Sequence, residues 1–299
     1  MPRIKANGIE LEYVIDGAAE ARPLLAIMGL GAQLIRWPQA FVDRLAARGF
    51  RVIRFDNRDV GLSEKFEAAG RPDLPAIMAA RAAGQAAPVA YTLDDMARDA
   101  VGLLDALGID KAHIVGASMG GMIAQLVAAD HPHKTHSLTS IFSTTGHPDL
   151  PPATPEAMAR LTLPAPDPRT DLEAYVAHSI ASSRVMGSPG YPAPDEKLRA
   201  EAIANAERCY YPVGFARQYA AIVASGNRRE RIRKITAPTT VIHGTDDPLV
   251  PVSGGRDTAA NIPGAVWVEF AGMGHDIPVE LFDPIIDAIA TNAARADQP

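Results

Sequence analysis

Gly116-Ala117-Ser118-Met119-Gly120 places a serine between two glycines, where a strand-like run gives way to a helix-compatible one. The run before it, His113-Ile114-Val115, suits a buried strand. A serine at a sharp strand-to-helix turn has cramped backbone angles, so small flanking residues are needed and its hydroxyl projects clear of the sheet. The stretch is typical of a nucleophile elbow, although glycine-flanked serines also occur in ordinary turns.

The composition indicates a globular protein that binds a small molecule. The 299 residues, of which 47% are hydrophobic and 21% charged, can form one large α/β domain or two small ones. The net charge of −6 argues against a nucleic-acid or anionic-membrane partner, because both require a basic face. The oligomeric state cannot be inferred from the sequence.

The cysteine content and the N-terminal residues predict a cytoplasmic protein. A single cysteine, Cys209, excludes an intramolecular disulfide and a cysteine-based zinc site, which fits a reducing compartment. Residues 1–8 contain no apolar signal region, and no apolar run in the chain is long enough to span a bilayer. We expect a soluble protein that needs neither a metal nor a cofactor.

Strand-like runs alternate with helix-like stretches, which predicts an α/β fold with a mostly parallel central sheet flanked by helices. Residues 64–91 are expected to be irregular, with one helical turn. The expected strands cover residues 9–15, 24–28, 51–55, the run before Gly116, 138–142, 239–244 and 265–270. The expected helices cover residues 38–48, 92–107, 119–129 and 280–294.

The alternation stops between about residues 145 and 232. Prolines interrupt the first part of this segment, and helix-like stretches follow without a strong strand. We interpret it as a helical cap inserted into an α/β core formed by residues 1–144 and 233–299. The candidate catalytic residues all lie at strand ends in that core.

His275 is the best candidate for a base that activates Ser118. A serine hydroxyl is a weak nucleophile until a base takes its proton, and histidine titrates close to neutral pH. His275 lies in a glycine-containing loop after the last expected strand, from which it can reach over the sheet. His113 and His243 lie within or at the end of strands, where packing is the simpler interpretation.

A metal site at the closely spaced histidines is disfavoured. Pro132 interrupts the helical face that they would share, and no acidic ligand completes the set. The histidines concerned are His131, His133 and His136.

A carboxylate is needed to orient the imidazole and stabilise its cation. Asp246 and Asp247 both follow an expected strand end. Asp247 is preferred because it precedes Pro248, which fixes the turn, whereas Asp246 is suited to cap or brace the loop. Asp149, which follows the preceding strand, is a more distant candidate.

Backbone N–H groups are suitable donors to the oxyanion of a tetrahedral intermediate, because they are preorganised. Met119 follows the serine and begins a helix, so its amide can donate. The second donor is expected from residues 28–31, with the amide of Leu30 preferred. Glycines after a strand also form ordinary turns, so a purely structural role for this loop stays open.

These motifs resemble the α/β-hydrolase superfamily over nearly the whole chain, including its order of serine, acid and histidine. Within it, the chain is similar to aclacinomycin methylesterase-like and cofactor-free haloperoxidase-like esterases. The matching pieces are residues 28–29, 56–63, 116–120, 244–251 and 272–275. The resemblance implies a triad and an oxyanion hole formed by Ser118, Asp247, His275, Leu30 and Met119.

The chain departs from many of these relatives at Met28, where they have histidine before the glycine. Because the expected donor is an amide, the oxyanion hole is still expected. Asp56 and Arg58 match a polar turn that we interpret as structural. Serine at position 118 argues against the haloalkane dehalogenase branch, which needs an aspartate there.

The sequence therefore predicts a serine carboxylesterase that hydrolyses small-molecule esters through an acyl-enzyme. The same triad would serve a lactonase, a perhydrolase or a carbon–carbon bond hydrolase, and a non-catalytic ligand receptor on this fold is a further alternative. Large side chains in the cap either line a substrate pocket or form the cap's own core. They are Tyr175, Met186, Tyr191, Tyr210, Tyr211 and Phe215.

Overall fold

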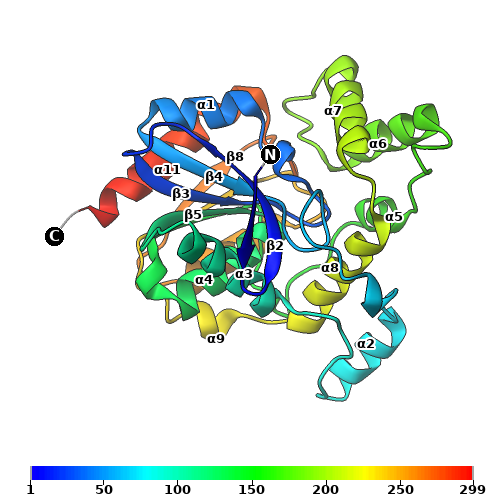
Figure 1. Ribbon diagram of the computed structural model, residues 1–299, viewed down its shortest axis with the longest axis horizontal. Coiled ribbons are helices and arrows are strands. Elements are labelled where there is room, and N and C mark those ends of the chain that lie inside the picture. Colours follow the sequence, from blue (N-terminus) through cyan, green and yellow to red (C-terminus); the bar gives the residue numbers. More distant parts are fainter. Residues whose placement is uncertain (1, 298–299) are drawn as a thin grey trace.

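A computed structural model of the chain describes residues 2–297. Within them, eight strands form one sheet in the order β1-β2-β4-β3-β5-β6-β7-β8 (Figure 1). The pairs β1–β2 and β2–β4 are antiparallel, and every later pair is parallel. The strands are β1 (Arg3–Ala6), β2 (Ile9–Asp16), β3 (Arg22–Ile27), β4 (Phe50–Phe55), β5 (Ala112–Ala117), β6 (Thr135–Ile141), β7 (Thr239–Gly244) and β8 (Val266–Phe270).

Helices cover both faces of the sheet, which explains the continuously apolar strands at its centre. One face carries α1 (Gln39–Ala47) and α11 (Phe282–Ala296), and the other carries α3 (Leu93–Ala106) and α4 (Met119–Asp130). In β3, alternate side chains enter the two cores: Leu24 packs with α1 and α11, and Leu25 packs with α3 and α4. The expected mostly parallel sheet flanked by helices is confirmed.

Three elements were not expected from the sequence, and one of them is the helix α10 (Val252–Asn261). β1 extends the sheet beyond β2 and was not predicted. The prediction of a single helical turn within residues 64–91 is wrong, because α2 (Leu74–Ala82) is a regular helix. Asp73 caps α2 by accepting the N–H of Ala76 at 3.0 Å. Only Ile77 of this helix is buried, so its sequence lacks the apolar periodicity of a core helix.

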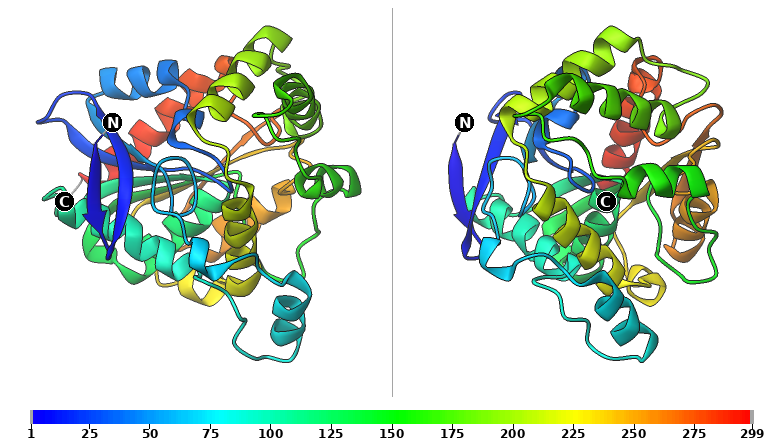
Figure 2. Two further views of the ribbon diagram at one scale, coloured as in Figure 1. Left: turned by 45° about the vertical axis from the view of Figure 1, so that its right-hand side comes forward. Right: turned by 90° about the vertical axis from the view of Figure 1, so that its right-hand side faces the viewer.

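The segment between β6 and β7, which we call the inserted segment (residues 145–232), forms a layer beside the sheet (Figures 1 and 2). The carboxyl ends of β3, β5 and β6 face the inserted segment, because Met28, Ala117 and Phe142 at these ends line a cavity that residues of the segment also line. Its helices are α5 (Pro155–Thr162), α6 (Leu172–Met186), α7 (Asp195–Arg208), α8 (Pro212–Ser225) and α9 (Arg229–Ile232).

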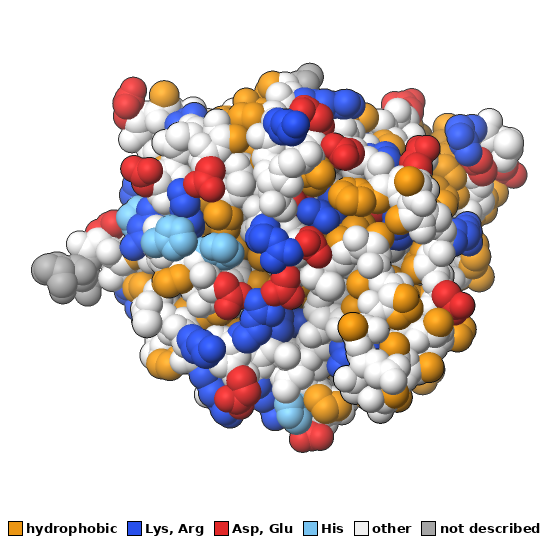
Figure 3. Space-filling view, turned by 60° about the horizontal axis from the view of Figure 1, so that its bottom comes forward, with side chains coloured by type: hydrophobic (Ala, Val, Ile, Leu, Met, Phe, Trp, Pro, Cys, Tyr) orange, Lys and Arg blue, Asp and Glu red, His pale blue; other side chains and the backbone are white. Residues whose placement is uncertain are grey.

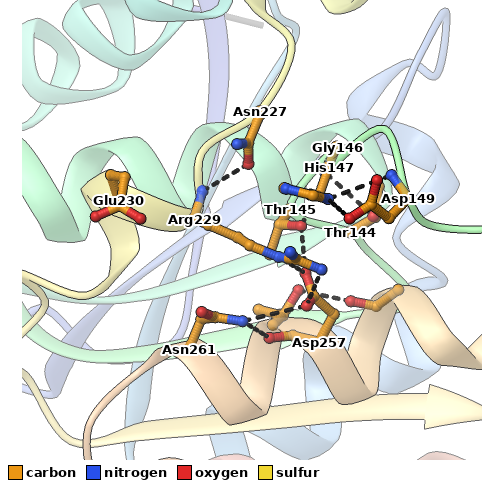
Figure 4. A network of polar contacts seen from close by, with 12 residues as sticks. Thr144, Thr145, Gly146, His147, Asp149, Asn227, Arg229, Glu230, Asp257 and Asn261 are labelled. Atoms are coloured by element: carbon orange, nitrogen blue, oxygen red, sulfur yellow. Dashed lines mark hydrogen bonds and ion pairs between the residues drawn. The ribbon is translucent and has the colours of Figure 1, made fainter.

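The two ends of the inserted segment lie side by side on the core. The N–H of Arg228 donates to the carbonyl of Thr145 at 2.8 Å. Asp257, on α10 (Val252–Asn261), accepts the hydroxyl of Thr145 and forms an ion pair of 2.6 Å with Arg229 (Figure 4). The segment therefore leaves and re-enters the core at one place.

The surface near α3, α4 and α9 carries interspersed charges (Figure 3). Arg231 of α9 pairs there with both Asp94 and Asp130, so its charge is matched by two carboxylates.

In the described part of the chain, no helix combines the length and the apolar character needed to cross a bilayer.

His113 provides a test of the packing. Its Nδ1 lies 2.9 Å from the hydroxyl of Ser137, and its ring packs edge-on against Phe50. Burial lowers the pKa of His113 to about 4. In the unfolded chain the pKa of this histidine is about 6.5, so the unfolded chain binds the proton at a higher pH than the folded protein does. The free energy of unfolding therefore falls by on the order of 3 kcal/mol as the pH drops from about 6.5 to 4.

We expect His113→Gln to reduce this loss of stability on acidification, as measured by urea unfolding at pH 7 and pH 4.5. His133→Gln, at an exposed position, is the control. A wild-type pH dependence in His113→Gln would show that another group causes the loss.

Candidate active site

Ser118 lies at the turn between β5 and α4, with backbone angles of φ 57° and ψ −122°. These angles are costly for a residue with a side chain, so the surroundings must hold them. A Cβ atom at Gly116 would lie 2.1 Å from the carbonyl oxygen of Gly120, and one at Gly120 would lie 2.0 Å from that of Ile27. Glycine is therefore required at both flanking positions by close backbone contact.

His275 lies in the loop between β8 and α11 and reaches back to the serine. Its Nε2 is 2.9 Å from Oγ of Ser118, within hydrogen-bond distance. Its ring packs against Phe142 with 4.8 Å between the centroids, and its backbone N–H donates to the carbonyl of Met186 at 2.7 Å. The imidazole is thus held on one side by the end of β6 and on the other by the inserted segment.

Asp247 lies on the loop after β7 and is buried. Its Oδ1 accepts the N–H groups of Leu249 and Val250 at 2.9 and 2.8 Å. Its Oδ2 lies 2.7 Å from Nδ1 of His275. Burial alone would raise the pKa of Asp247, but the charge of His275 and hydrogen bonds from His243 and His275 hold it below its usual range. Asp247 is therefore ionised at neutral pH.

The other two candidate carboxylates have different partners. Asp246 accepts the N–H of Gly272 at 2.9 Å, so it braces the loop that leads to His275. Asp149 pairs with His147 at 3.4 Å, and its side chain is 80% exposed. The structure brings Asp247 to His275 and leaves Asp246 and Asp149 away from it.

His243 is completely buried at the end of β7. Its Nε2 lies 2.8 Å from the carbonyl oxygen of Val250 and 3.5 Å from Oδ2 of Asp247. Because a carbonyl only accepts, Nε2 carries a proton. His243 therefore packs under the loop of Asp247, where it is shielded from solvent.

The two candidate oxyanion donors lie on either side of Ser118. Met119 is the first residue of α4, where backbone N–H groups lack partners within the helix. Leu30 lies in the loop after β3, and its N–H donates to no acceptor within residues 2–297, whereas the next amide, Gly31, donates to Gln218 at 2.8 Å. A Cβ atom at Gly29 would lie 3.0 Å from that of Ser118, so this loop runs directly beside the serine.

Ser118 and His275 open into a cavity of about 850 Å³ between the sheet and the inserted segment. Cavities of this size hold drug-sized molecules. Leu30 and Met119 also line it. Most of its wall is apolar, with side chains from both the core and the inserted segment, including Met28, Met122, Phe142, Met158, Leu161 and Ile222.

From the sequence, six large side chains of the inserted segment were expected either to line a substrate pocket or to form the segment's own core. Of these six, only Met186 lines this cavity. The hydroxyl of Tyr210 donates to the carbonyl of Ala165 at 3.1 Å, and that of Tyr211 accepts from Arg217 at 2.8 Å. The remaining aromatic side chains also pack elsewhere. They are Tyr175, Tyr191 and Phe215.

The polar turn after β4 has a structural role, as expected. Asp56 accepts the N–H groups of Leu34 and Leu62 at 2.7 and 2.8 Å and pairs with Arg208 of the inserted segment. Arg58 forms a buried ion pair with Asp99 at 2.6 Å. These contacts brace the loops around the site.

Two polar residues that lie beside His275 and line the cavity, Ser188 and Asp276, were missed by sequence reasoning. Ser188 belongs to the inserted segment and lies outside any motif. Asp276 follows His275 directly, and its carboxylate accepts the hydroxyl of Ser188. No signal in the sequence could have paired them, because 88 residues separate them.

Metal-ligating side chains are dispersed. Within residues 2–297, no three histidine, cysteine or acidic side chains are grouped in a way that could hold an ion. The ring of His136 lies against that of His113, whereas His131 and His133 adjoin each other. The candidate active site consists of a serine, a histidine and a carboxylate in a hydrogen-bonded line.

Two curated methylesterases are similar to this chain in sequence. Rhodomycin D methylesterase DauP of Streptomyces sp. (strain C5) is 30% identical over 292 residues, which cover 92% of this chain and 91% of DauP. Rhodomycin D methylesterase DnrP of Streptomyces peucetius is 28% identical over 292 residues, with the same coverage. The chain is thus similar to methylesterases along almost its full length.

A solved structure shares the fold as well. The meta-cleavage product hydrolase CumD from Pseudomonas fluorescens IP01 superimposes with a TM-score of 0.77 at 20% identity, over 99% of this chain and 98% of that one. Residues 22–280 match the family model of the alpha/beta hydrolase fold. The resemblance inferred from the sequence motifs is confirmed, and the chain belongs to the α/β-hydrolase family.

Proposed function

We propose that the protein is a serine carboxylesterase that hydrolyses small-molecule carboxylic esters through an acyl-enzyme. The observation that carries this proposal is the line of hydrogen bonds from Asp247 through His275 to Ser118, which ends in a largely apolar cavity. The names of the two methylesterases, which are similar over 92% of the chain, support ester substrates.

In the acylation step, Oγ of Ser118 attacks the ester carbonyl carbon while Nε2 of His275 takes the hydroxyl proton. The tetrahedral oxyanion accepts hydrogen bonds from the amides of Leu30 and Met119. As the ester C–O bond breaks, His275 returns the proton to the leaving alcohol. Asp247 stays ionised and stabilises the imidazolium, in keeping with its lowered pKa.

In the deacylation step, water takes the place of the alcohol. His275 removes a proton from the water as its oxygen attacks the acyl carbon, and the proton then passes to Oγ of Ser118 as the acid leaves. No redox or metal chemistry is needed for atoms and charges to balance. In this proposal the inserted segment is a cap, because its helices supply much of the wall around the acyl and alcohol groups.

Ser118→Ala tests the nucleophile. We expect loss of labelling by a fluorophosphonate probe and a fall in ester hydrolysis by at least about a thousandfold, since the attacking oxygen is absent. The measurements are in-gel labelling and release of p-nitrophenol from its acetate. A wild-type protein that stays unlabelled would indicate a ligand receptor, and wild-type rates in Ser118→Ala would exclude the mechanism.

The two neighbouring aspartates form a matched pair of variants. Asp247→Asn should reduce kcat by about 10⁴, because an amide at this position favours the wrong tautomer of His275. Asp246→Asn keeps an amide oxygen that can accept the N–H of Gly272, so it should cost less than about tenfold. Steady-state hydrolysis of p-nitrophenyl acetate measures both. If Asp246→Asn shows the larger loss, Asp247 is not the residue that orients His275.

A substrate panel tests the ester class. We expect methyl esters of bulky, apolar acids to be hydrolysed, because the cavity of about 850 Å³ is large and mostly apolar. The measurement is kcat/KM for such esters beside p-nitrophenyl esters of increasing acyl length. Activity confined to the acetyl ester would contradict an acyl site of this size.

A further inference from the structure

The inserted segment contacts the loop of His275 through residues 186–190, directly after α6. At one end of this contact, the N–H of His275 donates to the carbonyl of Met186 at 2.7 Å. At the other end, the N–H of Gly190 donates to the carbonyl of Gly272 at 2.9 Å. The two backbones are therefore hydrogen-bonded to each other across the whole loop.

Ser188 lies in the middle of this contact and is buried. Its hydroxyl accepts the N–H of Gly274 at 2.9 Å and donates to Oδ1 of Asp276. A serine hydroxyl has one proton and two lone pairs, so it can make both bonds at once. Gly274 and Asp276 are the two chain neighbours of His275. One side chain of the inserted segment therefore contacts both neighbours of the histidine, at the backbone N–H of Gly274 and at the carboxylate of Asp276.

The contact leaves no room for a side chain. A Cβ atom at Gly274 would lie 2.3 Å from the carbonyl oxygen of Gly187, and one at Gly190 would lie 2.9 Å from Cα of Gly272. Glycines on both sides thus allow the backbones to approach this closely. Movement of residues 186–190 would have to carry the loop of His275 with it.

The carboxylate of Asp276 depends on the same hydroxyl. Burial raises the pKa of Asp276, whereas hydrogen bonds from Ser188 and the charges of His275 and Lys197 oppose this rise. Within residues 2–297, no lysine, arginine or histidine lies within ion-pair distance of the carboxylate. Loss of the Ser188 hydroxyl would leave a half-buried carboxylate without its side-chain donor, which favours displacement of the loop.

We propose that Ser188 is a positioning residue, which holds the loop of His275 so that Nε2 stays aligned with Oγ of Ser118. This inference rests on the proposed function, because it assigns Ser188 to the proton-transfer group of that site. The inserted segment then has two tasks: it lines the cavity, and it fixes the base.

Ser188→Ala tests the proposal. We expect the second-order rate of fluorophosphonate labelling and kcat for p-nitrophenyl acetate to fall about 10- to 100-fold, because small misplacements of reacting groups have effects of this size. The KM for this small ester should change by less than about threefold, since it fills little of the cavity. A merely structural loss would lower the unfolding temperature and leave the labelling rate of the folded protein unchanged.

Ser225→Ala is the matched control. The hydroxyl of Ser225 also joins the inserted segment to the core, by accepting the N–H of Leu93 at 3.0 Å, but its partner belongs to α3 and not to the loop of His275. We expect this variant to be labelled at the wild-type rate. If folded Ser188→Ala is also labelled at the wild-type rate, the proposal is overturned. If the wild-type protein is not labelled, the proposed function fails whatever Ser188 does.

A second pair of variants tests the same hydrogen bond from the other side. Asp276→Asn keeps an acceptor for the hydroxyl of Ser188, whereas Asp276→Ala removes it. We expect Asp276→Asn to be labelled several-fold faster than Asp276→Ala. Equal labelling of the two folded variants would overturn the role of the Ser188–Asp276 bond, including in the case where Ser188→Ala does not fold.

Discussion

The candidate site depends on a close approach of three backbones at Ser118. The end of β3, the end of β5 and the first turn of α4 meet so closely that Gly116 and Gly120 cannot carry a Cβ atom. Main-chain packing therefore sets the position of Ser118, and its unusual φ is imposed by elements that cannot shift independently. The same approach places the loop of Leu30 beside the serine, so Ser118 and the candidate oxyanion donors are fixed together.

Parallel topology explains why residues 157 positions apart come into contact. β5, β7 and β8 all point in one direction, so the loops that follow them emerge at the same edge of the sheet. Asp247 survives burial there because its two oxygens have separate partners, the backbone amides for one and His275 for the other. The amides fix the direction in which the second oxygen points.

The core strands and the turns that carry Ser118 and His275 were predictable because they leave local signals. Central strands are continuous apolar runs, and Ser118 and His275 lie among glycines that mark tight turns. α2 lacked such a signal, since it buries only Ile77. The composition of the cavity wall was not predictable either. The sequence shows that Tyr210 is large and apolar, but it does not show that the hydroxyl of Tyr210 bonds within the inserted segment. The importance of Ser188 can be recognised only from the residues that its hydroxyl contacts in the structure.

The inserted segment is attached to the core both at its base and at the loop of His275. At its base, Arg228 is buried and donates to the carbonyls of Thr144 and Gly226 at 2.8 Å. Burial lowers the pKa of Arg228 to about 10, so it is still charged at neutral pH and needs these acceptors. Residues 186–190 form a further attachment at His275. The cavity-lining residues of α6 to α8 lie between these attachments, so a substitution among them need not disturb the contacts of Arg228 or of the loop of His275.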